Sequence, residues 1–170
     1  MMITNNSKVS FLDELLYQIP KADSIDIVVS FIMLSGLDLI LSKLREFTKH
    51  GRLRVITTAY FATTEYEAIR QLMTLDNTEV RMELDADESR LHAKAFIFRK
   101  EGHTVAYVGS ANLSKTALTS GEEWVVKLKE EEVPDIVRDV NIGFESIWNS
   151  ISYRRITKHN LSAVETALGK

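Results

Sequence analysis

The stretch LHAKAFIFRKEGHTVAYVGSANLSKTALTSGEEWVV, residues 91–126, decides the fold of this chain. Two runs rich in β-branched and aromatic residues, 91–99 and 103–108, flank a Lys-Glu-Gly sequence, which is typical of a β-hairpin. A short helix is predicted over 113–119 and a further strand over 123–128. The stretch therefore predicts an antiparallel hairpin followed by a short helix and a further strand.

Strands and helices alternate before this hairpin. Apolar residues at helical spacing, and short β-branched runs between them, predict a series of elements. The helices are expected at 7–19, 36–50, 63–75 and, after the hairpin, 134–151, and the strands at 24–33, 53–60 and 79–84. Alternating strands and helices favour parallel pairing. We therefore predict an α/β fold with a mixed, mostly parallel sheet flanked by helices on both faces.

The domain organisation follows from length and periodicity. A chain of 170 residues fits one domain with a continuous core. Residues 1–152 contain all the predicted elements and are expected to form that domain. Residues 153–170 have weak periodicity, which predicts a tail or the start of a linker to a missing domain.

Composition limits the classes of function. The chain is 45 % hydrophobic and 26 % charged, as in globular proteins. It has no cysteine, which excludes disulfides and thiolate metal sites and fits a cytoplasmic location. No segment has the length and apolarity of a membrane span or a signal peptide. With a net charge of -3, any nucleic acid is expected to bind at a local patch.

The hairpin stretch also carries the candidate functional residues. Residues two apart in a strand point to the same face, so His92 and Lys94 are predicted to project together. Gly109, Ser110 and Asn112 follow the second strand, where glycine allows close backbone approach and the predicted helix offers unpaired N–H donors. Each residue alone has an ordinary structural explanation, but together they predict a phosphate-binding site.

This pattern resembles the signature of the phospholipase D superfamily, HxKxxxxD followed by a Gly-Ser-x-Asn turn. His92 and Lys94 match HxK, and residues 109–112 match the turn. The order of elements is similar as well, from about residue 11 to residue 148. Two features depart from the family pattern. Arg99 stands where the family usually has Asp, and the separation of His92 from Asn112 is longer than usual, which a longer hairpin tip can absorb.

The resemblance implies metal-independent phosphodiester hydrolysis. His92 would attack phosphorus to form a phosphohistidine, and a second histidine would protonate the leaving oxygen. Lys94, Ser110 and Asn112 would hold the phosphate oxygens, and Glu123, placed where single-motif members have a Glu, would orient an imidazole. Because the chain has one such motif, the resemblance implies a homodimer with the active site on its two-fold axis. Neither a metal nor another cofactor is expected.

The segment also resembles the N-terminal module of bacterial DEAD/DEAH-type helicase proteins. No GxxxxGK[ST] sequence is present, so a helicase motor would be a separate part of a longer protein. The expected function is an endonuclease-like phosphodiesterase on nucleic acid, with DNA favoured, in a helicase-linked restriction or repair protein. Two alternatives stay open. One is a nucleic-acid-binding module that lost catalysis with the Asp at position 99, and the other is a phospholipid phosphodiesterase, against which the absence of a basic amphipathic helix counts.

Overall fold

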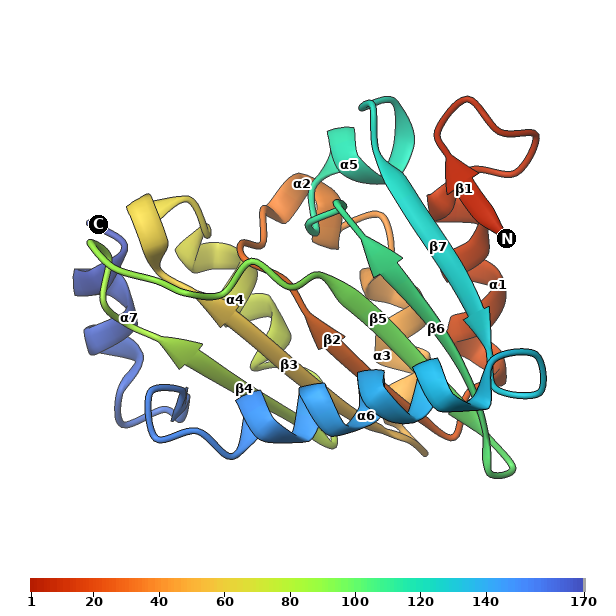
Figure 1. Ribbon diagram of the computed structural model, residues 1–170. Helices are drawn as coiled ribbons and strands as arrows, with labels where there is room; N and C mark the ends of the chain where they lie inside the picture. Colours follow the sequence, from red (N-terminus) through yellow and green to blue (C-terminus); the bar gives the residue numbers. More distant parts are fainter. Residues whose placement is uncertain (170) are drawn as a thin grey trace.

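Residues 1–169 are described by the structure, which is a computed structural model. They form one eight-stranded sheet with helices on both faces (Figure 1). The strands lie in the order β1-β7-β6-β5-β2-β3-β4-β8. Their bounds are Met2–Thr4 (β1), Ser24–Val28 (β2), Arg52–Thr58 (β3), Thr78–Glu83 (β4), Ala95–Lys100 (β5), His103–Gly109 (β6), Trp124–Lys129 (β7) and Arg154–Arg155 (β8).

The helices divide unequally between the two faces of the sheet. Their bounds are Phe11–Gln18 (α1), Leu34–Leu37 (α2), Leu41–Thr48 (α3), Tyr66–Leu72 (α4), Lys115–Thr119 (α5), Pro134–Trp148 (α6) and Leu161–Ala167 (α7), with 3-10 turns at Ile19–Lys21 (η1) and Tyr60–Ala62 (η2). In Figure 1, α6 crosses the front of the sheet, where Phe144 and Trp148 pack against Val28 and Ile97. The other α-helices contribute to the larger core on the opposite face.

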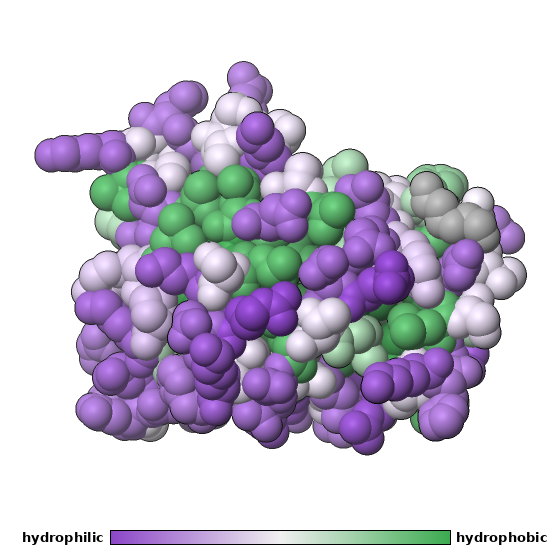
Figure 2. Space-filling view, turned by 180° about the vertical axis from the view of Figure 1, so that it is seen from behind, coloured by the Kyte–Doolittle hydropathy of each residue, from purple (hydrophilic) through white to green (hydrophobic). Residues whose placement is uncertain are grey.

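Figure 2 shows this opposite, helical face. Hydrophobic surface gathers in its upper part and is surrounded by hydrophilic residues. Several leucines of the helices that pack on the larger core stay partly exposed, including Leu12 and Leu16 of α1 and Leu41 of α3. The periodicity that predicted these helices therefore marks their inward faces without burying every apolar side chain.

The sheet is mixed, as predicted, but it is not mostly parallel. Among the described strands, only β2–β3 and β3–β4 pair in parallel, and all other neighbours are antiparallel. Parallel pairing requires a long crossover, which the helices between β2 and β4 provide. The short turn between β5 and β6 instead imposes antiparallel pairing, and β7 also pairs antiparallel with β6 although α5 lies between them. The prediction extended the pattern of the first half of the chain too far.

The first helix shows how the sequence sets an element's limits. The Ser10 hydroxyl accepts a hydrogen bond from the Asp13 N–H at 3.1 Å, and the Asp13 carboxylate accepts one from the Ser10 N–H at 3.3 Å. This capping box satisfies two N–H groups that a helix start leaves unpaired. Pro20 then ends the regular hydrogen bonding and lies in η1. The helix is therefore shorter than the predicted range of 7–19.

Residues 153–169 pack on the folded unit, so the tail expected there is not observed in the described part of the chain. Arg154–Arg155 pairs antiparallel with β4 as the edge strand β8. Ile156, Val164 and Leu168 are buried in the larger core. These three apolar residues are too few to give a clear helical period, which is why the sequence did not indicate the packing.

A buried charge cluster joins the sheet to α6. Asp26 of β2 is fully buried and accepts two hydrogen bonds from Arg54 of β3, at 2.8 and 2.7 Å. Arg54 also donates to Glu145 of α6 at 2.6 Å. Burial disfavours the charged guanidinium, but the hydrogen bonds to Asp26 and Glu145 outweigh it and raise the pKa of Arg54 above its usual value. The cluster therefore remains charged and orients α6 over the sheet.

Candidate active site

The candidate residues meet at one edge of the sheet. At this edge, which we call the carboxyl edge, β2, β3, β4 and β6 end and β5 and β7 begin. In Figure 1 the segment that connects β4 to β5 runs along it. Ligands of open α/β sheets bind outside the carboxyl ends of the parallel strands. The HxK and Gly-Ser-x-Asn segments therefore lie where the fold favours a binding site.

His92 and Lys94 lie at the carboxyl edge, but they do not lie within a strand as predicted. β5 begins at Ala95, and residues 91–94 form the segment that leads into it. The His92 side chain is exposed. Lys94 is partly buried, and its Nζ donates to the His92 carbonyl oxygen at 2.9 Å. Because an ammonium group has three N–H donors, two remain for an anion beside the imidazole.

Asn112 connects the turn to the histidine segment. Its Oδ1 accepts hydrogen bonds from the N–H groups of Ser30 at 2.8 Å and Phe31 at 3.2 Å. Two N–H donors identify this atom as the carbonyl oxygen, so the amide nitrogen points the other way. The Ser30 hydroxyl then donates to the carbonyl of Leu91 at 2.9 Å, directly before His92. Asn112 thus fixes the loop that positions His92 and keeps its amide N–H groups available.

Ser110 and Glu123 form a second polar pair at this edge. The Ser110 hydroxyl donates to the Glu123 carboxylate and accepts from the Trp124 N–H at 3.1 Å. β7 begins at Trp124, so Glu123 lies in the connection before the strand rather than in it. Across residues 1–169, no hydrogen bond joins Glu123 to an imidazole. The carboxylate that was expected to orient a histidine is therefore held by Ser110 within the single chain.

The predicted phosphate cradle differs in two details. A Cβ on Gly109 would lie 2.0 Å from the Trp124 carbonyl oxygen, so this glycine allows β7 to approach β6 closely. The helix expected directly after the turn begins only at Lys115, after the N-cap Ser114. Its first N–H groups therefore do not adjoin the turn. At the turn, side chains rather than helix N–H groups are therefore available to bind an anion, above all the side chain of Asn112.

Arg99, which stands where the family usually has Asp, lies far from this site. Five residues of extended chain separate it from Lys94, a distance of about 16 Å. Its guanidinium donates to Asp26 and to Asn141 of α6, both at 2.5 Å. Arg99 therefore belongs to the charge cluster under α6.

The hairpin explains why the longer spacing leaves the site intact. Regular pairing runs from Ala95 and Val108 at the carboxyl edge to the far tip of the hairpin. There Glu101 and Gly102, with φ of 49° and 81°, form a two-residue turn. Extra length at this tip does not alter the pairing at the carboxyl edge, so the two halves of the motif stay side by side.

An exposed aromatic pair at the carboxyl edge was not singled out from the sequence. The rings of Tyr60 and Phe61 stack with centroids 4.1 Å apart, and Phe61 is 74 % exposed. Phe61 and Ala62 have φ of 53° and 52°, which is unfavourable for residues with a side chain. The Phe61 N–H donates to the Ala86 carbonyl at 2.8 Å, in the loop that leads to His92. No local pattern in the sequence signals such a backbone conformation.

A mostly apolar cavity of about 270 Å³ lies beside His92 and Lys94, between α6 and the sheet. Its apolar lining comes from both elements and includes Val28, Ile97, Val108, Val140, Phe144 and Ile147. The carboxyl edge therefore offers both charged groups and an apolar recess.

The acidic loop before His92 is organised by its own backbone. The Asp85 carboxylate accepts from the N–H groups of Asp87 at 2.9 Å and Glu88 at 3.2 Å. Among residues 1–169, no three His, Asp or Glu side chains gather closely enough to hold a metal ion.

None of the helices described is long and apolar enough to cross a membrane.

Comparison with known families places the chain. The model of a family described as "Cardiolipin synthase, PLD-like domain" matches residues 15–148, which include both halves of the motif. The chain belongs to the phospholipase D-like family. The family predicted from the motif is thus confirmed, whereas the link to helicase proteins stays a prediction. No curated protein is significantly similar to the chain in sequence.

Solved structures of phospholipase D-like and other proteins share the fold. Nuc from Salmonella typhimurium, a phospholipase D family member, aligns with a TM-score of 0.67 and 19 % identity over 93 % of this chain and 97 % of that one. NucT from Helicobacter pylori has a TM-score of 0.61 and 18 % identity over 86 % of this chain and 94 % of that one. Polyphosphate kinase from Porphyromonas gingivalis has a TM-score of 0.61 and 14 % identity over 87 % of this chain and 22 % of that one. These similarities confirm the mixed α/β sheet flanked by helices.

Proposed function

We propose that this chain is a metal-independent phosphodiesterase that cleaves nucleic acid, in the manner of an endonuclease, through a phosphohistidine at His92. The main support is the meeting of an exposed imidazole, the Lys94 ammonium and the Asn112 amide at the carboxyl edge. Membership of the phospholipase D-like family supports the reaction class. The catalytic roles below are proposals for the residues of this chain.

The reaction proceeds in two displacements. An unprotonated His92 nitrogen attacks phosphorus, the bond from phosphorus to the leaving oxygen breaks, and a second imidazole donates a proton to that oxygen. This second imidazole, now neutral, takes a proton from water as the water attacks the phosphohistidine. The phosphorus–nitrogen bond then breaks and frees His92. Lys94 and the Asn112 amide N–H groups bind the non-bridging oxygens and stabilise the charge that develops there.

The second imidazole comes from a second copy of the chain. His50 and His103 lie at the opposite edge of the sheet, two residues before β3 and at the start of β6. His159 follows β8 near the other end of the sheet. A two-fold axis at the carboxyl edge would place two His92 side chains in one site. In that arrangement Glu123, held by Ser110, is available to orient an imidazole of the second copy.

Apolar surface close to the site supports this homodimer. Trp124, directly after Glu123, is 67 % exposed, and Val126 on the same face of β7 is 40 % exposed. Ile136 of α6 is 50 % exposed. We expect a molar mass of twice the chain mass in light scattering. A strict monomer at high concentration would contradict the shared site.

Nucleic acid is favoured as the substrate, and DNA within that class. The stacked Tyr60 and Phe61 rings stand at the carboxyl edge beside the loop that leads to His92, and exposed aromatic rings bind unpaired bases by stacking. The net charge of -3 confines phosphate binding to local cations such as Lys94. A helicase motor in a longer protein would supply the unpaired strand, in restriction or repair. Stimulation of cleavage by ATP in that longer protein would test this link.

A phospholipid phosphodiesterase is the second candidate. The apolar cavity beside His92 favours it, because an acyl chain can occupy such a recess. Hydrolysis of phosphatidylglycerol vesicles, measured with the same protein preparation, distinguishes the two substrates. The binding-module alternative rested on the absence of the family's Asp at position 99. Arg99 lies in the charge cluster and not in the site, so this absence does not favour a loss of catalysis.

The deciding experiment is cleavage of single- and double-stranded DNA in excess EDTA. The wild type, His92→Ala and His103→Ala are compared, since His103 is an exposed histidine at the hairpin tip. We expect cleavage by the wild type and His103→Ala and none by His92→Ala. Cleavage by His92→Ala at the wild-type rate would show that another group is the nucleophile.

A further inference from the structure

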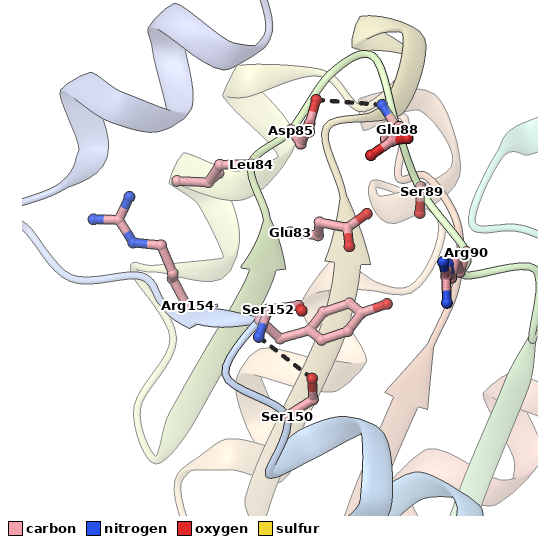
Figure 3. A pocket seen from close by; sticks show the side chains of 10 residues that line it. Glu83, Leu84, Asp85, Glu88, Ser89, Arg90, Ser150, Ser152 and Arg154 are labelled. Carbon is pink, nitrogen blue, oxygen red and sulfur yellow. Dashed lines mark hydrogen bonds between the residues drawn. The ribbon is translucent and has the colours of Figure 1, made fainter.

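A second, larger cavity opens next to the candidate active site (Figure 3). It has a volume of about 720 Å³ and lies between the end of β4 with the loop that follows and the connection from α6 to β8. It is lined by Glu83, Leu84, Asp85, Glu88, Ser89, Arg90, Ser150, Ser152, Tyr153 and Arg154. Arg90 is two residues before His92, so their Cα atoms are at most about 7 Å apart. A ligand bound at His92 can therefore extend into this cavity.

The cavity contains a carboxylate without a partner. Glu83 Oε1 is buried and has no hydrogen-bond partner, and no ion pair of Glu83 is found in residues 1–169. In Figure 3 its side chain points into the space between Arg90 and Arg154, which stand on opposite sides. Buried carboxylates are usually satisfied by donors, because an unpaired one is strongly destabilising. Glu83 lines the cavity, and the terminal torsion of a Glu side chain is soft, so a ligand that enters can turn the carboxylate and receive both of its oxygens.

An aromatic ring and several hydroxyls complete the lining. Tyr153 is partly buried, and burial together with the charge of Glu83 raises its pKa to about 12, so the ring is neutral at physiological pH. A neutral aromatic ring beside a hydrogen-bonding carboxylate is the combination that binds the face and the edge of a nucleobase. Ser150 accepts a hydrogen bond from the Ser152 N–H at 3.3 Å and keeps its hydroxyl proton for a ligand acceptor.

We propose that this cavity binds the guanine of the nucleotide next to the scissile phosphate, with the Glu83 carboxylate accepting hydrogen bonds from guanine N1–H and N2–H. The inference rests on the proposed nuclease function, because it assigns the neighbouring nucleotide of that substrate. Among the common bases, guanine alone presents two adjacent donors on its Watson–Crick edge, which match the two oxygens of a carboxylate. Adenine and cytosine present one amino group, and thymine one imide N–H. Arg90 at the rim then contacts a flanking phosphate.

The test measures nucleotide binding to the whole chain by calorimetry at low salt in EDTA. The probes are dGMP, dIMP, dAMP and dCMP, which contain no phosphodiester bond to cleave. Hypoxanthine lacks only the N2 amino group of guanine, so dGMP is expected to bind about tenfold or more tightly than dIMP. Equal affinity for dGMP and dIMP, or no binding of any of the four, would overturn the proposal.

Matched variants locate the effect. Glu83→Gln keeps the shape but replaces one acceptor oxygen with an NH2 donor, and is expected to abolish the preference for dGMP over dIMP. Glu88→Gln removes the same charge from an exposed position of the lining and is expected to retain the preference. Tyr153→Leu, which keeps an apolar side chain but removes the ring, should lower the affinity for all four nucleotides by a similar factor. A dGMP preference that survives in Glu83→Gln would assign the discrimination to another residue.

The nucleotide-binding assay tests the guanine site separately from the nuclease reaction. Selective dGMP binding by a protein that cleaves no DNA would reject the proposed nuclease reaction and retain the guanine site. Cleavage that depends on His92 without any discrimination between dGMP and dIMP would reject the guanine site alone. Thermal denaturation of each variant confirms that the folded protein is being compared.

Discussion

Restoring the family's acidic residue at position 99 is expected to damage this protein. In Arg99→Asp, a carboxylate replaces the guanidinium that donates to Asp26, and Asp26 is fully buried. The substitution leaves Asp26 paired with Arg54 alone and places a second negative charge on the neighbouring strand. Loss of one partner of a buried pair destabilises by about 3–5 kcal/mol. At about 2–4 °C per kcal/mol for a chain of this length, the melting temperature should fall by roughly 6–20 °C.

Arg99→Met supplies the matched control. It removes the same hydrogen bonds to Asp26 and Asn141 but adds no negative charge. The Arg99 side chain is 25 % exposed, so the expected loss is smaller, at about 2 kcal/mol, which is typical of a lost hydrogen bond to a charged group. The fall in melting temperature should then be about 4–8 °C. The order of stability is wild type, then Arg99→Met, then Arg99→Asp.

Thermal denaturation followed by circular dichroism measures this order, and DNA cleavage in EDTA measures activity per folded molecule. Arg99→Met should cleave at the wild-type rate below its melting temperature, because Arg99 lies about 16 Å along the strand from Lys94. If Arg99→Asp were as stable as the wild type, or more active, position 99 would belong to the active site and the charge-cluster assignment would be incorrect.

Three further outcomes are expected. Asn112→Asp keeps an acceptor for the two backbone N–H groups but loses the amide donor. The variant should therefore fold normally and cleave DNA about 100-fold more slowly. An unchanged rate in a cleavage assay would exclude Asn112 from phosphate binding. Gly109→Ala places a Cβ 2.0 Å from the Trp124 carbonyl oxygen. The free energy of unfolding, measured in urea, should therefore fall by about 1–3 kcal/mol or more. A variant as stable as the wild type would mean that β7 can move aside without loss of stability. Burial and the charge of Glu83 raise the pKa of Tyr153 to about 12, above the value of about 10 in the unfolded chain, so the contribution of the neutral Tyr153 to stability is constant below pH 10 and is lost as the pH approaches 12. In urea titrations, Tyr153→Phe should lack this part of the loss of stability at alkaline pH. Identical pH profiles of the wild type and the variant would contradict the raised pKa.

The sequence predicted the elements whose patterns are local. The hairpin of β5 and β6, the strands β2 to β4 and the long amphipathic α6 all lie close to their predicted positions. The strands near the two chain ends were not predicted, because β1 has three residues and β8 two, and each is defined by its pairing with a partner strand. Pairing with a distant strand leaves no periodic signal in so short a segment. For the same reason the predicted excess of parallel strands was wrong.

The candidate site shows the same division. Residue type and spacing predict His92, Lys94, Ser110, Asn112 and Glu123 as candidates, but not the contacts that each one makes. Asn112 acts on the histidine segment through Ser30, which is 82 residues away in the sequence. Such links between distant segments are set by packing.

Arg99, Phe61 and Glu83 illustrate features that the sequence could not predict. Arg99 is explained by Asp26, 73 residues away. The exposed ring of Phe61 depends on a positive φ, and the role proposed for Glu83 depends on a cavity formed by two separate segments. None of these features leaves a pattern in the neighbouring residues.

The most direct test of the central claim is a search for nucleic acid attached to His92. DNA and protein are mixed in EDTA, quenched with alkali, which preserves phosphohistidine, and examined by intact-protein and peptide mass spectrometry. We predict that the peptide that contains His92 gains the mass of the DNA fragment that stays attached through phosphorus, in the wild type and His103→Ala but not in His92→Ala. Cleavage of DNA without any adduct on His92 would contradict the phosphohistidine mechanism.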